Sequence, residues 1–132
     1  MDGFLKQSVT ATIRIGKYLD ETDGVTAETG LTILQANVRL AKNGGAAAQK
    51  HEASSCGHDE GGWYFCALDA TDTNTLGLLK IDASVAGACP VWHTYSVVTA
   101  NVYDTLFSTD NFDVEVATKT GFALSSVGVD AV

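Results

Sequence analysis

Short runs of alternating apolar and polar residues constrain the fold of this chain more than any other feature. Residues 9–15 (VTATIRI) alternate with a period of two, which is typical of a β-strand with one buried face. No long window shows apolar residues at the i, i+3 and i+4 spacing of an amphipathic helix. The pattern therefore predicts an all-β chain with almost no helix.

Further strands are expected at short intervals, separated by clusters of Gly, Asn and Asp. They are predicted at residues 31–34, 36–42, 46–52, 63–68, 76–82, 91–100 and 112–116, with 53–62 as a loop or weak strand and 102–107 as a strand or a helical turn. Seven to nine short strands in a chain of this length predict an immunoglobulin-like antiparallel β-sandwich. The side chains expected to face its core are Ile13, Ile15, Leu40, Tyr64, Cys66, Leu68, Leu79, Ile81 and Val97.

Composition limits the domain count and the classes of partner. The 132 residues are 45% apolar and 18% charged, which excludes disorder and predicts a single domain over residues 1–132. No run approaches the roughly 18 apolar residues of a membrane span, so no membrane partner is expected. Sixteen acidic residues stand against eight basic ones, a net charge of -8. Binding to phosphate backbones depends on Lys and Arg, so no nucleic-acid partner is expected.

The three cysteines are Cys56, Cys66 and Cys89. An odd number does not suit a disulfide framework, and we expect free thiols in a reducing compartment. A second interpretation is a cross-strand bridge between Cys56 and Cys66, because a hairpin turning at Gly61 would place them opposite each other.

Metal binding finds little support in the spacing of the candidate ligands. His51, Cys56, His58 and Cys66 are of the types that bind zinc, but no Cys-x2-Cys pair occurs among them. The acidic segments at residues 20–24 and 69–74 lack the spacing of a calcium-binding EF-hand and are expected to be solvated turns. We therefore expect no metal and no cofactor.

Catalytic motifs are equally weak. The sequence has no Gly-x-Ser-x-Gly elbow, and in an extended chain His93 would lie roughly 13 Å from Cys89, too far for proton transfer. Sixteen acidic residues leave a spatial carboxylate pair open, yet most of them fall in predicted turns. The chain is expected not to be an enzyme, with no catalytic residues.

Apolar residues that the core does not need are candidates for contacts with other molecules. Both faces of the 63–68 strand are apolar, so the second face meets a loop, another subunit or a glycan. The two ends, residues 1–8 and 120–132, are rich in apolar side chains and are candidate assembly arms; the alternative is that both ends are edge strands of their own sandwich. The candidate interface residues are Phe4, Leu5, Trp63, Phe65, Trp92, Phe122, Leu124, Val127 and Val129.

Several motifs in sequence order resemble a family of tailed-bacteriophage virion proteins, in particular the N-terminal β-sandwich domain of phage baseplate upper proteins. The resemblance covers roughly residues 1–107 and rests on DGFLKQS (2–8), TDGVTAETGLTI (22–33), VRLAKNGG (38–45), HDEGGWY (58–64), LDATDTNTLG (68–77), VWH (91–93) and ANVYD (100–104). Members are usually described as phage structural, tail-fibre or baseplate proteins, and the family has no catalytic residues to transfer.

The resemblance implies a structural virion protein assembled in the bacterial cytoplasm. A tail component is expected, anchoring a fibre or serving as an adaptor or part of the baseplate, in contact with other virion proteins and with copies of itself. Two alternatives remain open at this point: a decoration protein on the capsid, and a carbohydrate-binding module that contacts host surface glycans through Trp63 and Trp92.

Overall fold

Eight strands, one short 3-10 helix and one α-helix make up residues 1–108, the part of the chain that this computed structural model describes. In chain order they are β1 (Gly3–Lys6), β2 (Ala11–Ile15), η1 (Gln35–Asn37), β3 (Val38–Lys42), β4 (Ala48–Gln49), β5 (Gly57–Glu60), β6 (Trp63–Leu68), β7 (Gly77–Ala83), β8 (Val91–Val98) and α1 (Ala100–Phe107). The prediction of an all-β fold with little helix is confirmed.

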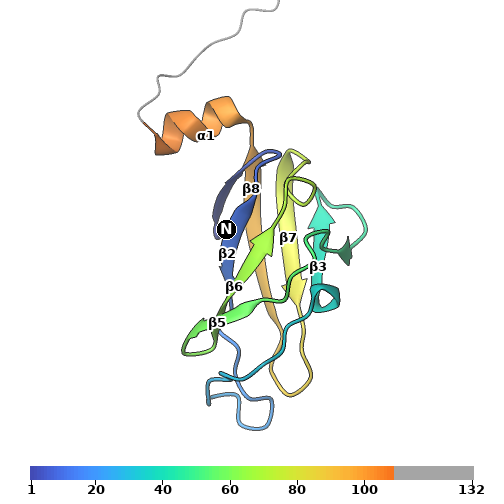
Figure 1. Ribbon diagram of the computed structural model, residues 1–132, viewed down its shortest axis with the longest axis vertical. Helices are drawn as coiled ribbons and strands as arrows, with labels where there is room; N and C mark the ends of the chain where they lie inside the picture. Colours follow the sequence, from blue (N-terminus) through green and yellow to red (C-terminus); the bar gives the residue numbers. More distant parts are fainter. Residues whose placement is uncertain (109–132) are drawn as a thin grey trace, which may run out of the picture.

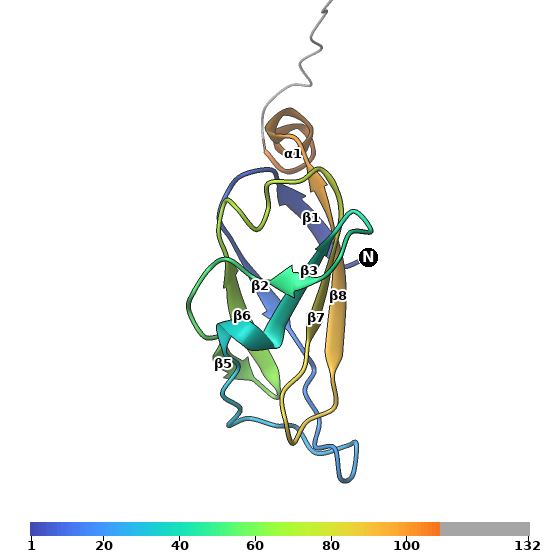
Figure 2. The same ribbon diagram turned by 90° about the vertical axis from the view of Figure 1, so that its right-hand side faces the viewer.

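The strands form two sheets that face each other, and Figure 2 shows the two layers side by side. The larger sheet has the order β1-β8-β7-β3-β4, and the smaller has the order β2-β6-β5. Strand pairs are antiparallel apart from β1 and β8, which run parallel. A wholly antiparallel sandwich was expected, and this pair corrects it: the first strand enters the sheet beside the last one.

The core lies between the two sheets and is built by period-two alternation. All nine residues predicted to face inward are buried, none more than 4% exposed. In β6, for example, Tyr64, Cys66 and Leu68 are buried, whereas Phe65 between them is exposed. Burying each of these apolar side chains contributes roughly 1.5–3 kcal/mol, so the alternation fixes the register of the strands.

A long segment between β2 and β3 is held by two buried tyrosines that the sequence did not mark as anchors for it. The Tyr18 ring packs edge-on against Tyr64 at 5.5 Å, and its hydroxyl donates to the carbonyl of Ala83. The Tyr64 hydroxyl donates to the Glu28 carbonyl at 2.7 Å and accepts from the Leu31 N–H at 3.1 Å. Burial raises the pKa of Tyr18, so it stays neutral in this site.

Residues 31–34 do not form the expected strand. Only Ile33 makes a ladder contact, a single bridge to Cys56. The Leu31 N–H is bonded to the Tyr64 hydroxyl, and the Leu34 N–H is bonded to the side chain of Asn37 at the end of η1. Side-chain partners therefore replace the strand partners that a ladder needs.

The strand expected over residues 46–52 is only two residues long as β4. The reason lies in the Asp72 carboxylate, which accepts from the backbone N–H groups of His51 at 2.7 Å and Glu52 at 3.2 Å. Because these two N–H groups bond to a buried side chain and not to a neighbouring strand, β4 ends before them.

The N-terminal segment contains an edge strand of the domain itself, as the alternative to an assembly arm predicts. β1 pairs with β8 over its whole length, and Leu5 is buried in the core. Residues 112–116 and 120–132, the predicted strand and second arm, lie outside the described residues.

Candidate interaction surface

The outer face of the five-stranded sheet carries three exposed apolar side chains. Alternation in β7 and β8 sends Leu78 and Trp92 outward, with 54% and 64% of their surface exposed. The register places Phe4 of β1 and Leu78 of β7 on either side of Ser96. Trp92 stands opposite Asp82 further along the same face.

Helix α1 extends this face at one end of the sandwich, where it leaves β8 and crosses the end of the sheet (Figure 1). Thr99 caps the helix, accepting from the Val102 N–H. The Phe107 ring lies 5.8 Å from that of Phe4 and remains exposed on its other side. We refer to Phe4, Leu78, Trp92 and Phe107 together as the outer apolar surface.

An ion pair fixes α1 against β1. Lys6 Nζ lies 2.7 Å from Asp104 Oδ1 and 5.8 Å from the centre of the Tyr103 ring. Tyr103 in turn packs on Phe107 at 4.8 Å. The exposed Phe107 ring is therefore held in place from two sides, by Phe4 and by Tyr103.

The other predicted interface residues lie elsewhere. Phe65 is exposed, but it lies on the outer face of the three-stranded sheet, where it pairs with Arg14 and Gly57. Trp63 is half-buried, with the Arg14 guanidinium 5.2 Å from its ring centre and the His93 ring 6.2 Å away.

The structure therefore brings Phe4 and Trp92 onto one face, separates them from Phe65, and removes Leu5 to the core. Phe122, Leu124, Val127 and Val129 lie outside the described residues. Leu78 and Phe107 were not predicted. Leu78 could have been found, because a strand that buries Leu79 and Ile81 must point Leu78 outward.

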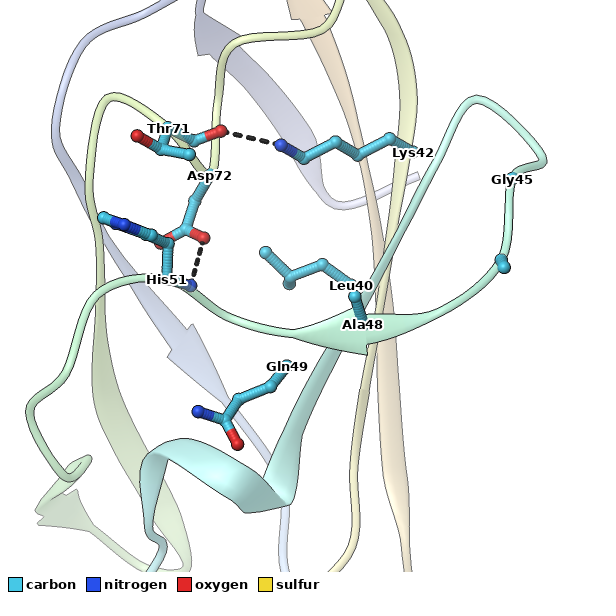
Figure 3. Close-up of a pocket in the computed structure, with 9 residues that line it drawn as sticks. Leu40, Lys42, Gly45, Ala48, Gln49, His51, Thr71 and Asp72 are labelled. Carbon is cyan, nitrogen blue, oxygen red and sulfur yellow. Dashed lines mark hydrogen bonds between the residues drawn. The ribbon is translucent and has the colours of Figure 1, made fainter.

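A cavity of about 400 Å³ lies at the opposite edge of the large sheet, between β4 and the segment that carries Thr71 and Asp72 (Figure 3). Lys42 Nζ donates to the Thr71 carbonyl at 2.7 Å and to Asn74 Oδ1 at 2.8 Å. Asp72 is buried and bonded to the backbone N–H groups of His51, Glu52 and Asp69. The charged groups that line this cavity thus hold the surrounding loops together.

His51 sits at the rim of this cavity, and its Nδ1 lies 2.5 Å from Asp69 Oδ2. Hydrogen bonding to Asp69 raises the pKa of His51, and the same bond lowers the pKa of Asp69. The His51 side chain is exposed and that of Asp69 is partly exposed, so the contact lies at the surface.

His93 resembles a catalytic histidine but has no free nitrogen. Nδ1 lies 3.2 Å from Asp2 Oδ1, and Nε2 accepts a hydrogen bond from the Gly16 N–H at 3.1 Å. Asp2 also accepts from the Thr94 N–H at 2.7 Å. Burial acts to raise the pKa of Asp2, but the hydrogen bonds from Thr94 and His93 outweigh it, and the pKa is lowered. Both ring nitrogens of His93 are thus engaged, and the ring links β8 to Gly16 and Asp2.

The four candidate zinc ligands do not converge on one site. His51 pairs with Asp69, and the His58 ring packs on Tyr64 at 5.0 Å. Within residues 1–108, no three His, Cys, Asp or Glu side chains cluster closely enough to bind a metal ion. Over the same residues, α1 and η1 are too short to cross a membrane.

Comparisons with protein-family models, with curated proteins and with solved structures found no match to this chain.

Proposed function

We propose that this chain is a non-enzymatic structural protein of a tailed-bacteriophage particle, acting through protein–protein contacts at the tail as a fibre-anchoring, adaptor or baseplate component. The sequence motifs between residues 2 and 104 support the phage origin. The outer apolar surface carries the proposed mode of action, because exposed apolar side chains that gather on one face of a folded domain favour protein contacts.

The fold proposed for this role is immunoglobulin-like. In immunoglobulin domains of the variable type, one sheet contains strands G, F, C and C′ in that order, and the other contains B, E and D. The order β8-β7-β3-β4 matches the first set and β2-β6-β5 matches the second. The framework disulfide of antibody domains has no counterpart in these strands, since all three cysteines are free.

The proposed absence of catalysis is supported by the state of the best acid–base candidates. His93 has both nitrogens bonded, and Asp72 is saturated by three backbone donors. Cys89 Sγ donates to the Asp20 carbonyl at 3.8 Å and has no histidine beside it in the contacts described.

Electron microscopy of the particle whose genome encodes this chain tests the proposal. With gold-labelled antibody against the chain, label at the tail, in multiples of three or six copies around its axis, supports it. Label spread over the capsid in hundreds of copies would replace the tail assignment with a head-decoration role. Particles without any label would overturn the virion proposal altogether.

A glycan-binding role is the second candidate, and the exposure of Trp92 favours it. Stacking on a sugar needs an open aromatic face, which Trp92 has and which Trp63 lacks because Arg14 covers it. Binding to a glycan array that is abolished in Trp92→Ala and kept in Trp63→Phe would support this role. An array without any signal would exclude it for the sugars tested.

A further inference from the structure

The β5–β6 hairpin places two free thiols side by side in the core. Gly57 pairs with Phe65 across this antiparallel ladder, so Cys56 lies directly opposite Cys66. Cys56 is 7% exposed and Cys66 is fully buried.

The pair occupies the ladder position that best suits a cross-strand bond. The Cys56 N–H donates to the Ile33 carbonyl at 2.9 Å, on the side away from β6. Cys56 and Cys66 are therefore a non-hydrogen-bonded pair, for which the Cα atoms are about 4.5 Å apart and the side chains are closest. Disulfides span Cα separations of about 4.4–6.8 Å, so the backbone needs no rearrangement to accept one.

The two thiols differ in their surroundings. The hydrogen bond from the Cys66 thiol lowers the pKa of Cys56 despite desolvation, and the Lys50 ammonium acts in the same direction. The hydrogen bond to Cys56 and burial raise the pKa of Cys66. Lys50 is itself buried, with Nζ 3.2 Å from the carbonyl of Ala67, the residue after Cys66. Cys56 is thus both the more acidic and the more accessible sulfur.

We propose that Cys56 and Cys66 form an oxidation site that closes into an intramolecular disulfide on reaction with a peroxide. The Cys56 thiolate attacks one oxygen of hydrogen peroxide, the O–O bond breaks, and Cys56 sulfenic acid and hydroxide form. The Cys66 sulfur then attacks the Cys56 sulfur, the S–O bond breaks, and water leaves with the Cys66 proton. Hydroxide takes up the proton that Cys56 released, so two thiols and one peroxide give one disulfide and two waters.

The disulfide would link the start of β5, an edge strand of the small sheet, covalently to β6. Within residues 1–108, β5 has no partner in its sheet beyond β6, and all four of its residues are exposed. A bond from Cys56 to Cys66 closes the loop around the Gly61–Gly62 turn and restricts the unfolded chain. We expect the melting temperature to rise by roughly 10 °C on oxidation. This inference does not depend on the proposed function.

The test uses the purified, fully reduced 132-residue chain treated with a stoichiometric amount of hydrogen peroxide. The expected product is a monomer lighter by two hydrogens, with Cys89 as the one alkylatable cysteine and Cys56 linked to Cys66 in the peptide map. Its raised melting temperature should return to the starting value with a thiol reductant.

Cys89→Ser is the matched control and should respond as the native chain does, whereas Cys56→Ser and Cys66→Ser should show no reversible rise. If Cys56→Ser or Cys66→Ser fails to fold, the peptide map of the oxidised native chain still shows whether the Cys56–Cys66 disulfide forms. Three alkylatable thiols after treatment, oxygen added to Cys56 without a bridge, or a dimer linked through Cys89 would each overturn the proposal.

Discussion

The Nε2 atom of His93 accepts a hydrogen bond from the backbone N–H of Gly16 at 3.1 Å, and this contact joins the two sheets of the sandwich. His93 belongs to β8 in the large sheet, and Gly16 directly follows β2 in the small one. The same ring binds Asp2 ahead of β1, so one buried side chain ties together three segments that are distant in sequence.

Replacing His93 with Phe should destabilise the domain by about 1–3 kcal/mol. The ring volume is kept, but the Gly16 N–H loses its acceptor inside the protein. Urea denaturation measures the change. Trp92→Phe, one residue earlier on the exposed side of β8, is the control and should change the free energy of unfolding by less than about 0.5 kcal/mol. Equal effects of the two substitutions would show that the contact contributes nothing.

Asp2 should contribute stability that is lost in acid. Its pKa is lowered in the folded protein from the ordinary value of 3.8, so the contribution to stability is present above that value and disappears as the pH falls through the lower pKa of the folded state. Asp2→Asn should be less stable than the native chain at about pH 5, and the difference should shrink steadily as the solution is made more acidic. A difference that stays constant over this range would argue against the carboxylate as its source.

Replacing Lys50 with Met should lower the free energy of unfolding by about 3 kcal/mol or more. The buried ammonium lies 2.6 Å from Glu52 Oε2 and donates to the carbonyls of Glu52, Ser54 and Ala67. Removing it leaves these acceptors without their buried donor. Lys80→Met, on the exposed face of β7, is the matched control and should lie within about 0.5 kcal/mol of the native chain. Thermal or urea unfolding of the two variants would show the contrast, and a stable Lys50→Met would mean that water replaces the ammonium.

The turn between β5 and β6 should tolerate a methyl group at one glycine and not at the next. Both Gly61 and Gly62 have positive φ, but a Cβ on Gly62 would lie 2.6 Å from the Tyr18 carbonyl oxygen, whereas one on Gly61 meets nothing within 4 Å. We expect Gly61→Ala to cost about 1–2 kcal/mol from backbone strain alone. Gly62→Ala should cost clearly more, as a larger fall in melting temperature. Equal falls would mean that the Tyr18 loop moves away freely.

Local patterns in the sequence predicted the core well and the sheet edges poorly. β6 was predicted with its bounds, because alternation and aromatic content coincide in residues 63–68. β5 has four exposed residues and therefore no alternation to detect. The sequence leaves the N-terminal segment open between an arm and an edge strand, because the partner β8 lies about ninety residues away and no local signal marks a parallel pairing.

The candidate interaction surface could likewise be predicted only where a local pattern marked its residues. Trp92 and Phe4 were predicted as interface candidates from their residue type, and the structure places them on one face. Leu5 and Phe4 are neighbours in sequence, yet only the register of β1 decides which of them points inward. The hydrogen bonds of His93 join residues 77 and 91 positions apart, a separation at which no spacing rule applies.

Incorporation of surface variants into particles tests whether the outer apolar surface holds this protein in a virion. A Leu78→Lys/Trp92→Lys variant and a Phe65→Lys control would each replace the native chain during phage assembly. Both should fold, because all three side chains are exposed in the isolated domain. We expect the double variant to be missing from purified particles and the control to be present at native copy number. A double variant that enters particles as well as the native chain would refute the proposed role of this surface.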